Sequence, residues 1–218
     1  MNEPGADTRD DDGDWLLRGS ADVDDVTRFY DDWAGRYDDD LVDWSYEAPD
    51  VAARMLLEHG PNPSRVLDAG CGTGLVGRAL RRAGHEGELV GIDVSAASLE
   101  LADRTGAYSA TRAADLQQPL GFDDGSFAGL ICVGVMTYVP GVEAAWREFA
   151  RVVAPGGVVV VTQREDLWDE RECRSVIDTL SDEGVWTPIE VTEAQPYLPG
   201  NDQYSDAIGV HYVVARAI

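Results

Sequence analysis

Three glycines at alternate positions, Gly70, Gly72 and Gly74, follow directly on an apolar segment that ends in Asp68 and Ala69. Such a turn brings the backbone close to a ligand, because glycine has no Cβ and adopts positive φ angles freely. Asp68 places a carboxylate beside the turn. A carboxylate repels a pyrophosphate and favours a ligand that carries an amino group and a positive centre. The chemistry indicated is binding of a cationic ligand without phosphate.

Three hypotheses about the ligand follow from this turn. S-adenosylmethionine fits, since it carries an α-ammonium and a sulfonium and no phosphate. A dinucleotide is the alternative, because Gly72, Gly74 and Gly77 spell a literal G-x-G-x-x-G motif. In that register the first glycine comes too late for the tight turn after the strand, and in the register from Gly70 the third position is Leu75, which is too large for close helix–strand packing. A glycine-rich turn without a ligand is the third hypothesis, and the first is favoured.

The elements that position this turn alternate along the chain from Arg65 onward. Apolar runs at residues 66–67, 89–92, 130–133 and 158–161 are typical of parallel strands covered on both faces. Between these runs, apolar residues recur at helical spacing. This alternation predicts an α/β domain that binds its ligand at the carboxyl ends of the strands.

The tail of the chain departs from this alternation. A helix is expected near residues 169–182, followed by strand patterns at 185–191 and 209–214. Pro188 in the first of these suits an edge strand, where a missing backbone donor costs least.

The chain resembles the class I S-adenosylmethionine-dependent methyltransferases over residues 23–216. Matches to the family's ordered motifs fall at residues 68–74, 89–95, 114–116, 123–131 and 149–157. The resemblance implies a doubly wound, Rossmann-like sheet of seven mostly parallel strands, with an antiparallel last strand and helices on both faces. It also implies S-adenosyl-L-methionine as cofactor and S-adenosyl-L-homocysteine as product.

The resemblance implies a role for individual residues as well. The glycine turn would lie beside the methionine part of the cofactor, Asp93 would accept both ribose hydroxyls, and Asp115 would accept from the adenine amino group. Asp93 also suits a dinucleotide, whose ribose acid lies about 20 residues beyond its glycine turn. The expected cofactor-binding residues are Tyr30, Trp33, Tyr37, Asp68, Ala69, Gly70, Cys71, Gly72, Gly74, Leu75, Asp93, Val94, Ser95, Ala114, Asp115, Leu116, Val133 and Gly134.

Before the first strand, one face of a predicted helix carries Val23, Val26, Tyr30, Trp33 and Tyr37 at spacings of three and four. The segment resembles one that folds over the cofactor in many small-molecule methyltransferases, and the nearest resemblance is to the Williams-Beuren syndrome region methyltransferase-like subfamily. It implies a lid in which Trp33 or Tyr37 touches the cofactor. Core packing also explains such a stripe. The expected organisation is therefore a disordered acidic tail (1–20), an N-terminal helical lid (21–60) and a class I methyltransferase domain (61–218).

The catalytic residues are not fixed by a motif. Methyl transfer displaces an activated sulfonium leaving group, so a base is needed only where the acceptor must lose a proton. Tyr138 and His211 are the candidates, and a structural role is the alternative for His211, which falls in the last strand pattern. Residues 134–138 lack the Asn/Asp-Pro-Pro-Tyr signature of enzymes that methylate amino groups of nucleic acid bases or glutamine.

The composition limits the partners. The chain has 41 acids against 17 bases, a net charge of −24, and every base is arginine. Such a field opposes docking on nucleic acid or on an anionic membrane. Either a halophilic cytoplasm, where molar salt screens the repulsion, or a codon bias against lysine explains it. Three separate cysteines (Cys71, Cys132 and Cys173) and three histidines indicate neither a disulfide framework nor a metal site. A cytoplasmic location is expected, since neither a signal peptide nor a membrane-spanning run is found.

The function predicted from the sequence is transfer of a methyl group from S-adenosylmethionine to a small-molecule acceptor by a monomer or homodimer. Two alternatives stay open. One is a sensor or partner protein that binds the cofactor without turnover. The other is methylation of a protein or an RNA.

Overall fold

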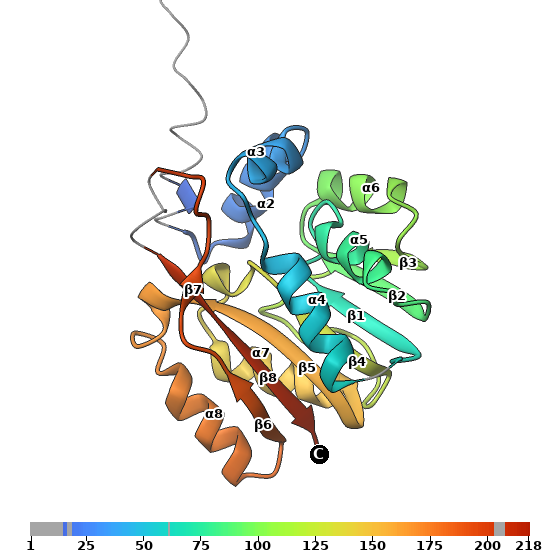
Figure 1. The fold of residues 1–218 in the computed structure, drawn as a ribbon, viewed down its shortest axis with the longest axis vertical. Coiled ribbons are helices and arrows are strands. Elements are labelled where there is room, and N and C mark those ends of the chain that lie inside the picture. Colours follow the sequence, from blue (N-terminus) through green and yellow to red (C-terminus); the bar gives the residue numbers. More distant parts are fainter. Residues whose placement is uncertain (1–14, 17–18, 61, 203–207) are drawn as a thin grey trace, which may run out of the picture.

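The computed structural model describes residues 15–16, 19–60, 62–202 and 208–218. A single mixed sheet forms its centre, with strands in the order β3-β2-β1-β4-β5-β8-β6 and a short β7 beside β8 (Figure 1). The order changes direction between β1 and β4, and open α/β sheets bind ligands at such a switch point. The doubly wound fold predicted from the alternating pattern is confirmed.

Strands β1 to β5 pair in parallel, whereas β8 runs antiparallel to both of its neighbours, as expected for the last strand. Pro188 lies in the edge strand β6, next to a shift in the pairing register. The strands are β1 (Arg65–Ala69), β2 (Glu88–Asp93), β3 (Ala110–Ala113), β4 (Phe127–Cys132), β5 (Val153–Arg164), β6 (Trp186–Val191), β7 (Gln195–Pro196) and β8 (Gly209–Ala217).

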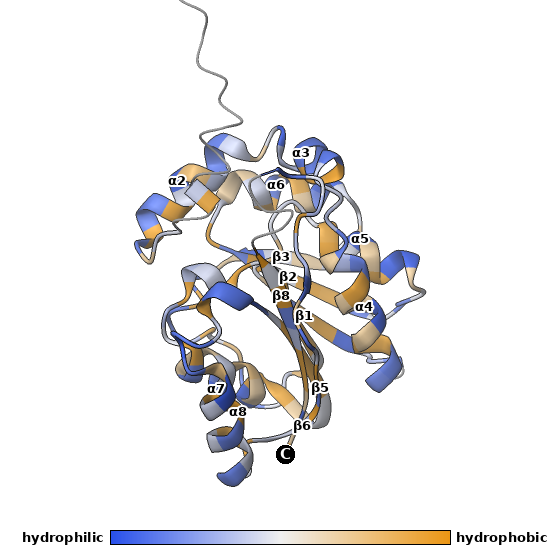
Figure 2. Ribbon diagram, turned by 60° about the vertical axis from the view of Figure 1, so that its left-hand side comes forward, coloured by the Kyte–Doolittle hydropathy of each residue, from blue (hydrophilic) through white to orange (hydrophobic). Residues whose placement is uncertain are grey.

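Helices cover both faces of the sheet, and Figure 2 shows α4 and α5 on one side and α7 and α8 on the other. Each layer buries an apolar cluster against the strands, with Leu56 and Leu80 in one and Trp146 and Phe149 in the other. The helices are α2 (Val23–Trp33), α3 (Tyr37–Asp43), α4 (Ala48–His59), α5 (Leu75–Arg82), α6 (Ala96–Arg104), α7 (Val142–Val152) and α8 (Cys173–Asp182), with short 3-10 turns η1 (Met136–Tyr138) and η2 (Glu165–Leu167).

The N-terminal stripe forms two helices instead of the single helix expected. The helix α2 ends at Trp33, a turn holds Gly35, and α3 begins at Tyr37. Glycine is about 1 kcal/mol less favourable than alanine inside a helix, so the chain breaks there. The start of α2 is fixed by Asp22, whose side chain accepts hydrogen bonds from the backbone N–H groups of the first turn.

Most of the expected disordered tail, residues 1–14 and 17–18, lies outside the described residues. The expectation is wrong for Trp15, which is helical and stacks on Phe29 with ring centroids 3.8 Å apart. Trp15 also lies 5.4 Å from the Tyr138 ring. Large aromatic surfaces gain free energy when they leave water, which fixes this residue against α2.

Two other boundaries differ from the pattern. The helix expected from residue 169 begins at Cys173, because residues 165–172 form η2 and turns. The strand β3 was not visible as an apolar run, since it reads Ala-Thr-Arg-Ala, lies at the sheet edge and is largely exposed.

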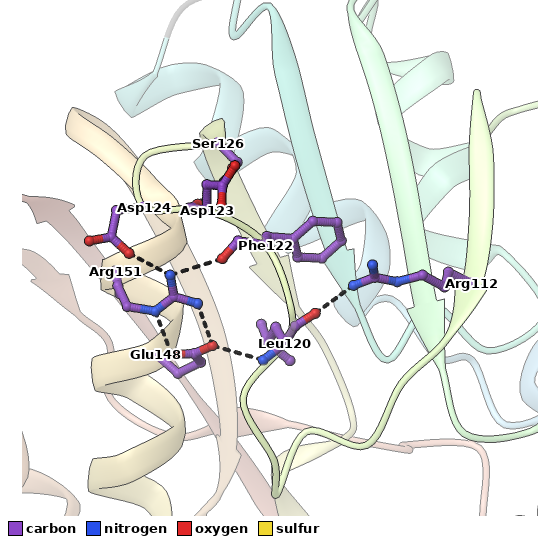
Figure 3. A network of polar contacts seen from close by, with 8 residues as sticks. All are labelled: Arg112, Leu120, Phe122, Asp123, Asp124, Ser126, Glu148 and Arg151. Carbon is purple, nitrogen blue, oxygen red and sulfur yellow. Dashed lines mark hydrogen bonds and ion pairs between the residues drawn. The ribbon is translucent and has the colours of Figure 1, made fainter.

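A polar network fastens the loop between β3 and β4 to α7 (Figure 3). Arg151 donates to the Phe122 carbonyl at 2.9 Å and pairs with Asp124 and Glu148. Glu148 in turn accepts from the Leu120 N–H at 2.8 Å. The Arg151 bonds lower the pKa of Glu148 and keep it charged. This loop begins with residues 114–116, so the network supports one wall of the site described next.

Within the described residues, no helix is long and apolar enough to cross a membrane. The same part of the chain holds no cluster of three or more histidine, cysteine, aspartate or glutamate side chains suited to a metal ion.

Candidate functional site

A cleft of ≈ 740 Å³, partly open to solvent, lies at the carboxyl ends of β1 to β4 and beneath α2. The lining residues come from the loops after the four strands and from the N-terminal helices: Val23, Val26, Tyr30, Tyr37, Gly70, Gly72, Thr73, Asp93, Val94, Ser98, Ala114, Asp115, Leu116, Gln117, Val133, Gly134, Val135, Tyr138 and Val139.

The glycine turn after β1 requires glycine for two different reasons. All three glycines have positive φ, which other residues rarely adopt. A Cβ on Gly70 would come within 2.3 Å of Val135, so the loop after β4 fits only against glycine. A Cβ on Gly72 would meet nothing within 4 Å, because this residue faces open space. The backbone at Gly72 is thus exposed to a ligand in the cleft.

Asp93 ends β2 and is tied to that turn. Its two carboxylate oxygens accept backbone hydrogen bonds at 2.9 Å, one from the N–H of Gly72 and one from that of Ser95. Burial raises the pKa of Asp93, and these bonds oppose the rise. Each carboxylate oxygen has a second lone pair, so the group can still accept hydrogen bonds from a ligand's hydroxyls.

Asp68 is fully buried beneath the glycine turn and does not line the cleft. The Tyr108 hydroxyl donates to Asp68 Oδ2 at 2.6 Å, whereas Oδ1 has no hydrogen-bond partner among the described residues. Burial raises the pKa of Asp68 to about 7. The Asp68 carboxyl group therefore lies below the loop, where a positive centre above the turn would favour its ionised form.

The loop after β3 forms the far wall. The Ala114 N–H donates to the Asp93 carbonyl at 2.9 Å, and the Asp115 side chain accepts from the Gln117 N–H at 2.8 Å. Leu116 closes this end with an apolar side chain. An adenine ring needs this combination of a polar acceptor at its edge and an apolar face.

The N-terminal helices cover the cleft. Tyr30 and Tyr37 line it, and the Tyr30 hydroxyl donates to the Tyr138 hydroxyl at 2.9 Å across the opening. Trp33 does not line the cleft, although it was expected to contact the cofactor. It is 1% exposed, and its indole N–H donates to Asp40 at 2.8 Å. Trp33 therefore packs between α2 and α3, because that position of the helix faces the neighbouring helix.

Two aspartates of these helices bind the loops that form the site. Asp31 accepts from the Ser95 hydroxyl at 2.6 Å and from the Ala97 N–H at 3.2 Å, at the start of α6. Asp38 accepts from the Thr73 hydroxyl at 2.5 Å and pairs with Arg78 of α5. The helices are thereby joined to the loops after both β1 and β2.

The two catalytic candidates lie in different places. Tyr138 lines the cleft on η1, and burial raises its pKa, so it is a neutral phenol at physiological pH. Arg171 holds this turn by donating to the carbonyls of residues 136, 137 and 139. His211 does not line the cleft. Its ring lies 4.2 Å from that of Trp168, and its Nδ1 lies 2.9 Å from the Thr192 carbonyl, contacts that suit the structural role named as the alternative.

The structure brings most of the residues expected from the sequence to one cleft. Those that do not line it pack behind the glycine turn, in β1 or in neighbouring helices: Trp33, Asp68, Ala69, Cys71, Gly74, Leu75 and Ser95. Burial raises the pKa of the Cys71 thiol, which fits its place among Leu99 and Ala102. Sequence reasoning missed Thr73, Ser98, Gln117, Val135 and Val139 in the lining, and Tyr108 below it.

Known proteins are similar to this chain in sequence. A family model described as a methyltransferase domain matches residues 67–161. The human protein named "Methyltransferase-like protein 27" is 34% identical over 175 residues, which cover 77% of this chain and 71% of that protein. The chain belongs to the class I S-adenosylmethionine-dependent methyltransferases. The membership expected from the sequence motifs, including the subfamily resemblance, is thus confirmed.

Solved structures give the methyltransferase the same fold. One is a chain from the complex between the Haloferax volcanii Trm112 methyltransferase activator and the putative methyltransferase, with a TM-score of 0.64 and 19% identity over 86% of this chain and 97% of that one. Another is the geranyl diphosphate C-methyltransferase from Streptomyces coelicolor A3(2), bound to S-adenosyl-L-homocysteine, with a TM-score of 0.61 and 16% identity over 77% of this chain and 79% of that one. The methyltransferase uses S-adenosylmethionine as its cofactor.

Proposed function

We propose that this methyltransferase transfers the methyl group of S-adenosylmethionine to a small-molecule acceptor. The observation that carries the proposal is the cover over the cleft. Tyr30 and Tyr37 lie over the loop after β4, and the Tyr30–Tyr138 hydrogen bond closes the opening between them. A small molecule fits beneath α2 and α3 as it is, whereas a nucleic acid would have to flip out a base to reach the same space.

The charge of the chain supports the same acceptor class. A net charge of −24 opposes binding to a polyanion, whose affinity for proteins comes largely from neutralised phosphates. The geranyl diphosphate C-methyltransferase, which shares the fold, is likewise named for a small-molecule acceptor.

The described residues fit the cofactor. In the proposed mode, the open backbone face at Gly72 lies along the methionine part, and the buried, unpartnered oxygen of Asp68 favours the positive charges above it. Asp93 has lone pairs for two ribose hydroxyls, and Asp115 offers an acceptor to the adenine amino group. The proposed lid is formed by residues 21–60, of which Tyr30 and Tyr37 complete the cleft.

The protein's part in the reaction is then alignment and exclusion of water. The bound cofactor supplies an activated methyl group on a sulfonium. Tyr138 and Tyr30 border the space that an acceptor would enter, and the bonds of Asp31 and Asp38 keep the covering helices closed over it. Holding two reactants in line removes much of the entropic barrier to the reaction.

A transfer experiment tests the acceptor class. Purified protein and S-adenosylmethionine labelled on its methyl carbon are incubated with a cell extract, which is then separated by size. We expect label in the metabolite fraction, and none there with the Asp93→Ala variant. Label confined to protein or RNA would overturn the proposal, and cofactor binding without any labelled product would favour a sensor.

A further inference from the structure

A second cavity, of ≈ 350 Å³, lies behind the cleft and is called here the inner chamber. The cleft and the inner chamber share four lining residues, Tyr30, Tyr37, Gly134 and Tyr138. The remaining lining residues are Leu16, Trp33, Leu41, Tyr46, Thr137, Arg164, Tyr197 and Leu198. The two cavities thus adjoin at the four residues that they share.

Half of the lining residues named above for the inner chamber are aromatic. The Tyr30 ring lies 5.7 Å from the Tyr138 ring and nearly perpendicular to it, and 6.0 Å from the Tyr37 ring at an angle of 66°. The Trp33 ring lies 4.7 Å from the Tyr37 ring. On the other side, Tyr46 and Tyr197 are 5.4 Å apart and nearly perpendicular. Rings that are inclined to one another present both faces and edges to their surroundings. The face of an aromatic ring attracts a cation.

The only charged side chain among the described residues of this lining is that of Arg164, and it is neutralised locally. Asp166 binds it twice, at 3.0 Å and 2.6 Å, and it also donates to the Leu16 carbonyl. The tyrosines stay uncharged as well, because burial raises the pKa of Tyr30, Tyr46 and Tyr138. Among the described residues, the lining therefore has no carboxylate or imidazole that could take a proton from an acceptor.

We propose that the inner chamber binds the amino group of an aliphatic amine and that this nitrogen is the methyl acceptor. The proposal rests on the small-molecule methyltransferase function above and names its acceptor class. An aliphatic amine arrives as an ammonium and first releases one proton to water, which frees the lone pair that attacks the methyl group. An aliphatic hydroxyl is a far weaker acid and needs a base on the protein. A nearby hydroxyl oxygen, that of Tyr138, accepts from Tyr30 and has a second lone pair for an amine N–H.

The methyl transfer moves a positive charge from sulfur to nitrogen, and aromatic rings can stabilise that charge. The nitrogen lone pair forms the N–C bond, while the C–S bond breaks and its electron pair stays on sulfur. The sulfonium becomes a neutral thioether, and the positive charge moves to the nitrogen. The new ammonium then loses a proton to water if it carries one. Aromatic faces stabilise the cation on both sides of the step, and the acidic surface of the chain attracts a cationic amine from solution.

Binding of a permanent cation tests the inner chamber without turnover. Full-length protein saturated with S-adenosylhomocysteine is titrated calorimetrically with choline and with its uncharged isostere 3,3-dimethylbutan-1-ol. We expect choline to bind at least tenfold more tightly than the isostere. Tyr46 lines the inner chamber and not the cleft, so Tyr46→Leu should weaken choline about tenfold while Tyr46→Phe, which keeps the ring, preserves it.

Phe122→Leu is the matched control, because it also removes an aromatic ring but at a residue that lines neither cavity. It should leave choline binding unchanged. Equal affinity for choline and its isostere, or equal loss in the Leu and Phe variants of Tyr46, would overturn the amine assignment. Loss of S-adenosylhomocysteine binding itself would instead count against the proposed function.

The labelled product of the extract experiment provides a second readout. We expect a product that is retained on a cation exchanger at neutral pH. A neutral or anionic labelled metabolite would overturn the amine class and leave the small-molecule function standing.

Discussion

Asp38 joins the N-terminal helices to the glycine turn, and Asp38→Ala should release them. The carboxylate accepts from the Thr73 hydroxyl at 2.5 Å and pairs with Arg78. The Arg78 and Asp38 side chains are 38% and 36% exposed, so solvent screening leaves that ion pair at most about 1 kcal/mol. Thr73 is only 4% exposed, and its bond to a charged group contributes roughly 1.5 kcal/mol.

Together these contributions lie between about 1.5 and 2.5 kcal/mol, and the middle of that range, about 2 kcal/mol, corresponds to a roughly 30-fold change in a local opening equilibrium. Hydrogen exchange of the α3 amides measures that equilibrium directly, because exchange there requires the helix to separate from the turn. We expect protection of α3 to fall about 30-fold in Asp38→Ala and protection of the central strands β4 and β5 to stay unchanged.

The neighbouring Asp39 is exposed and provides the control, since Asp39→Ala carries the same charge change on the same helix. Equal α3 protection in Asp38→Ala, Asp39→Ala and the unaltered protein would refute the reasoning, because the contacts of Asp38 would then contribute nothing to closure. Saturation with S-adenosylhomocysteine should restore part of the lost protection, since a ligand in the cleft stabilises the closed arrangement.

Three further predictions concern charge. The raised pKa of Asp68, about 7, means that the folded protein holds a proton which the unfolded chain releases near pH 4. The stability that this proton contributes is therefore lost as the pH rises through 7. Asp68→Asn should raise the melting temperature of the ligand-free protein above pH 7, and calorimetry should show that the variant binds S-adenosylmethionine more weakly. Burial lowers the pKa of His85, so stability should fall as the pH drops below about 6.5 and the unfolded state takes up a proton; chemical denaturation of His85→Leu should show less of this dependence. The net charge of −24 predicts a melting temperature that rises steeply between about 0.1 and 2 M KCl, and a flat profile would favour codon bias over adaptation to salt.

The parts of the site that the sequence predicted are those encoded locally. The glycines after β1 and the acid that ends β2 lie in short motifs, and the chain direction alone brings the ends of neighbouring parallel strands to one edge. Asp93 and Gly72 are 21 residues apart, yet their hydrogen bond follows from that geometry.

The parts of the site that the sequence did not predict depend on contacts between residues far apart in the chain. Such contacts leave no periodic pattern in the sequence. Tyr108 reaches Asp68 from 40 residues away, and Asp31 reaches Ser95 across 64 residues. In the sequence, the acids at 31 and 38 look like ordinary solvated residues of the helices that carry them. The place of Trp33 behind the cleft was not predictable for a related reason, since an aromatic stripe shows which face of a helix is buried but not which neighbour covers each position.

The sequence did not predict the secondary structure of two segments that carry few buried apolar residues. The edge strand β3 is mostly exposed, so its sequence carries no apolar run, and Trp15 lies in an acidic stretch whose composition suggests disorder although the ring stacks on Phe29. Composition averages over a segment, whereas a single large side chain can order its neighbours.

The most direct test is calorimetric titration of S-adenosylhomocysteine into the protein and into Asp93→Ala, with the exposed Glu100→Ala of α6 as control. Bonds to a charged carboxylate are worth roughly 1.5–3 kcal/mol each, so Asp93→Ala should bind at least tenfold more weakly, and Glu100→Ala should bind as the unaltered protein does. Thermal melts should show that both variants remain folded. Unchanged affinity in a folded Asp93→Ala variant would contradict the placement of the cofactor in this cleft.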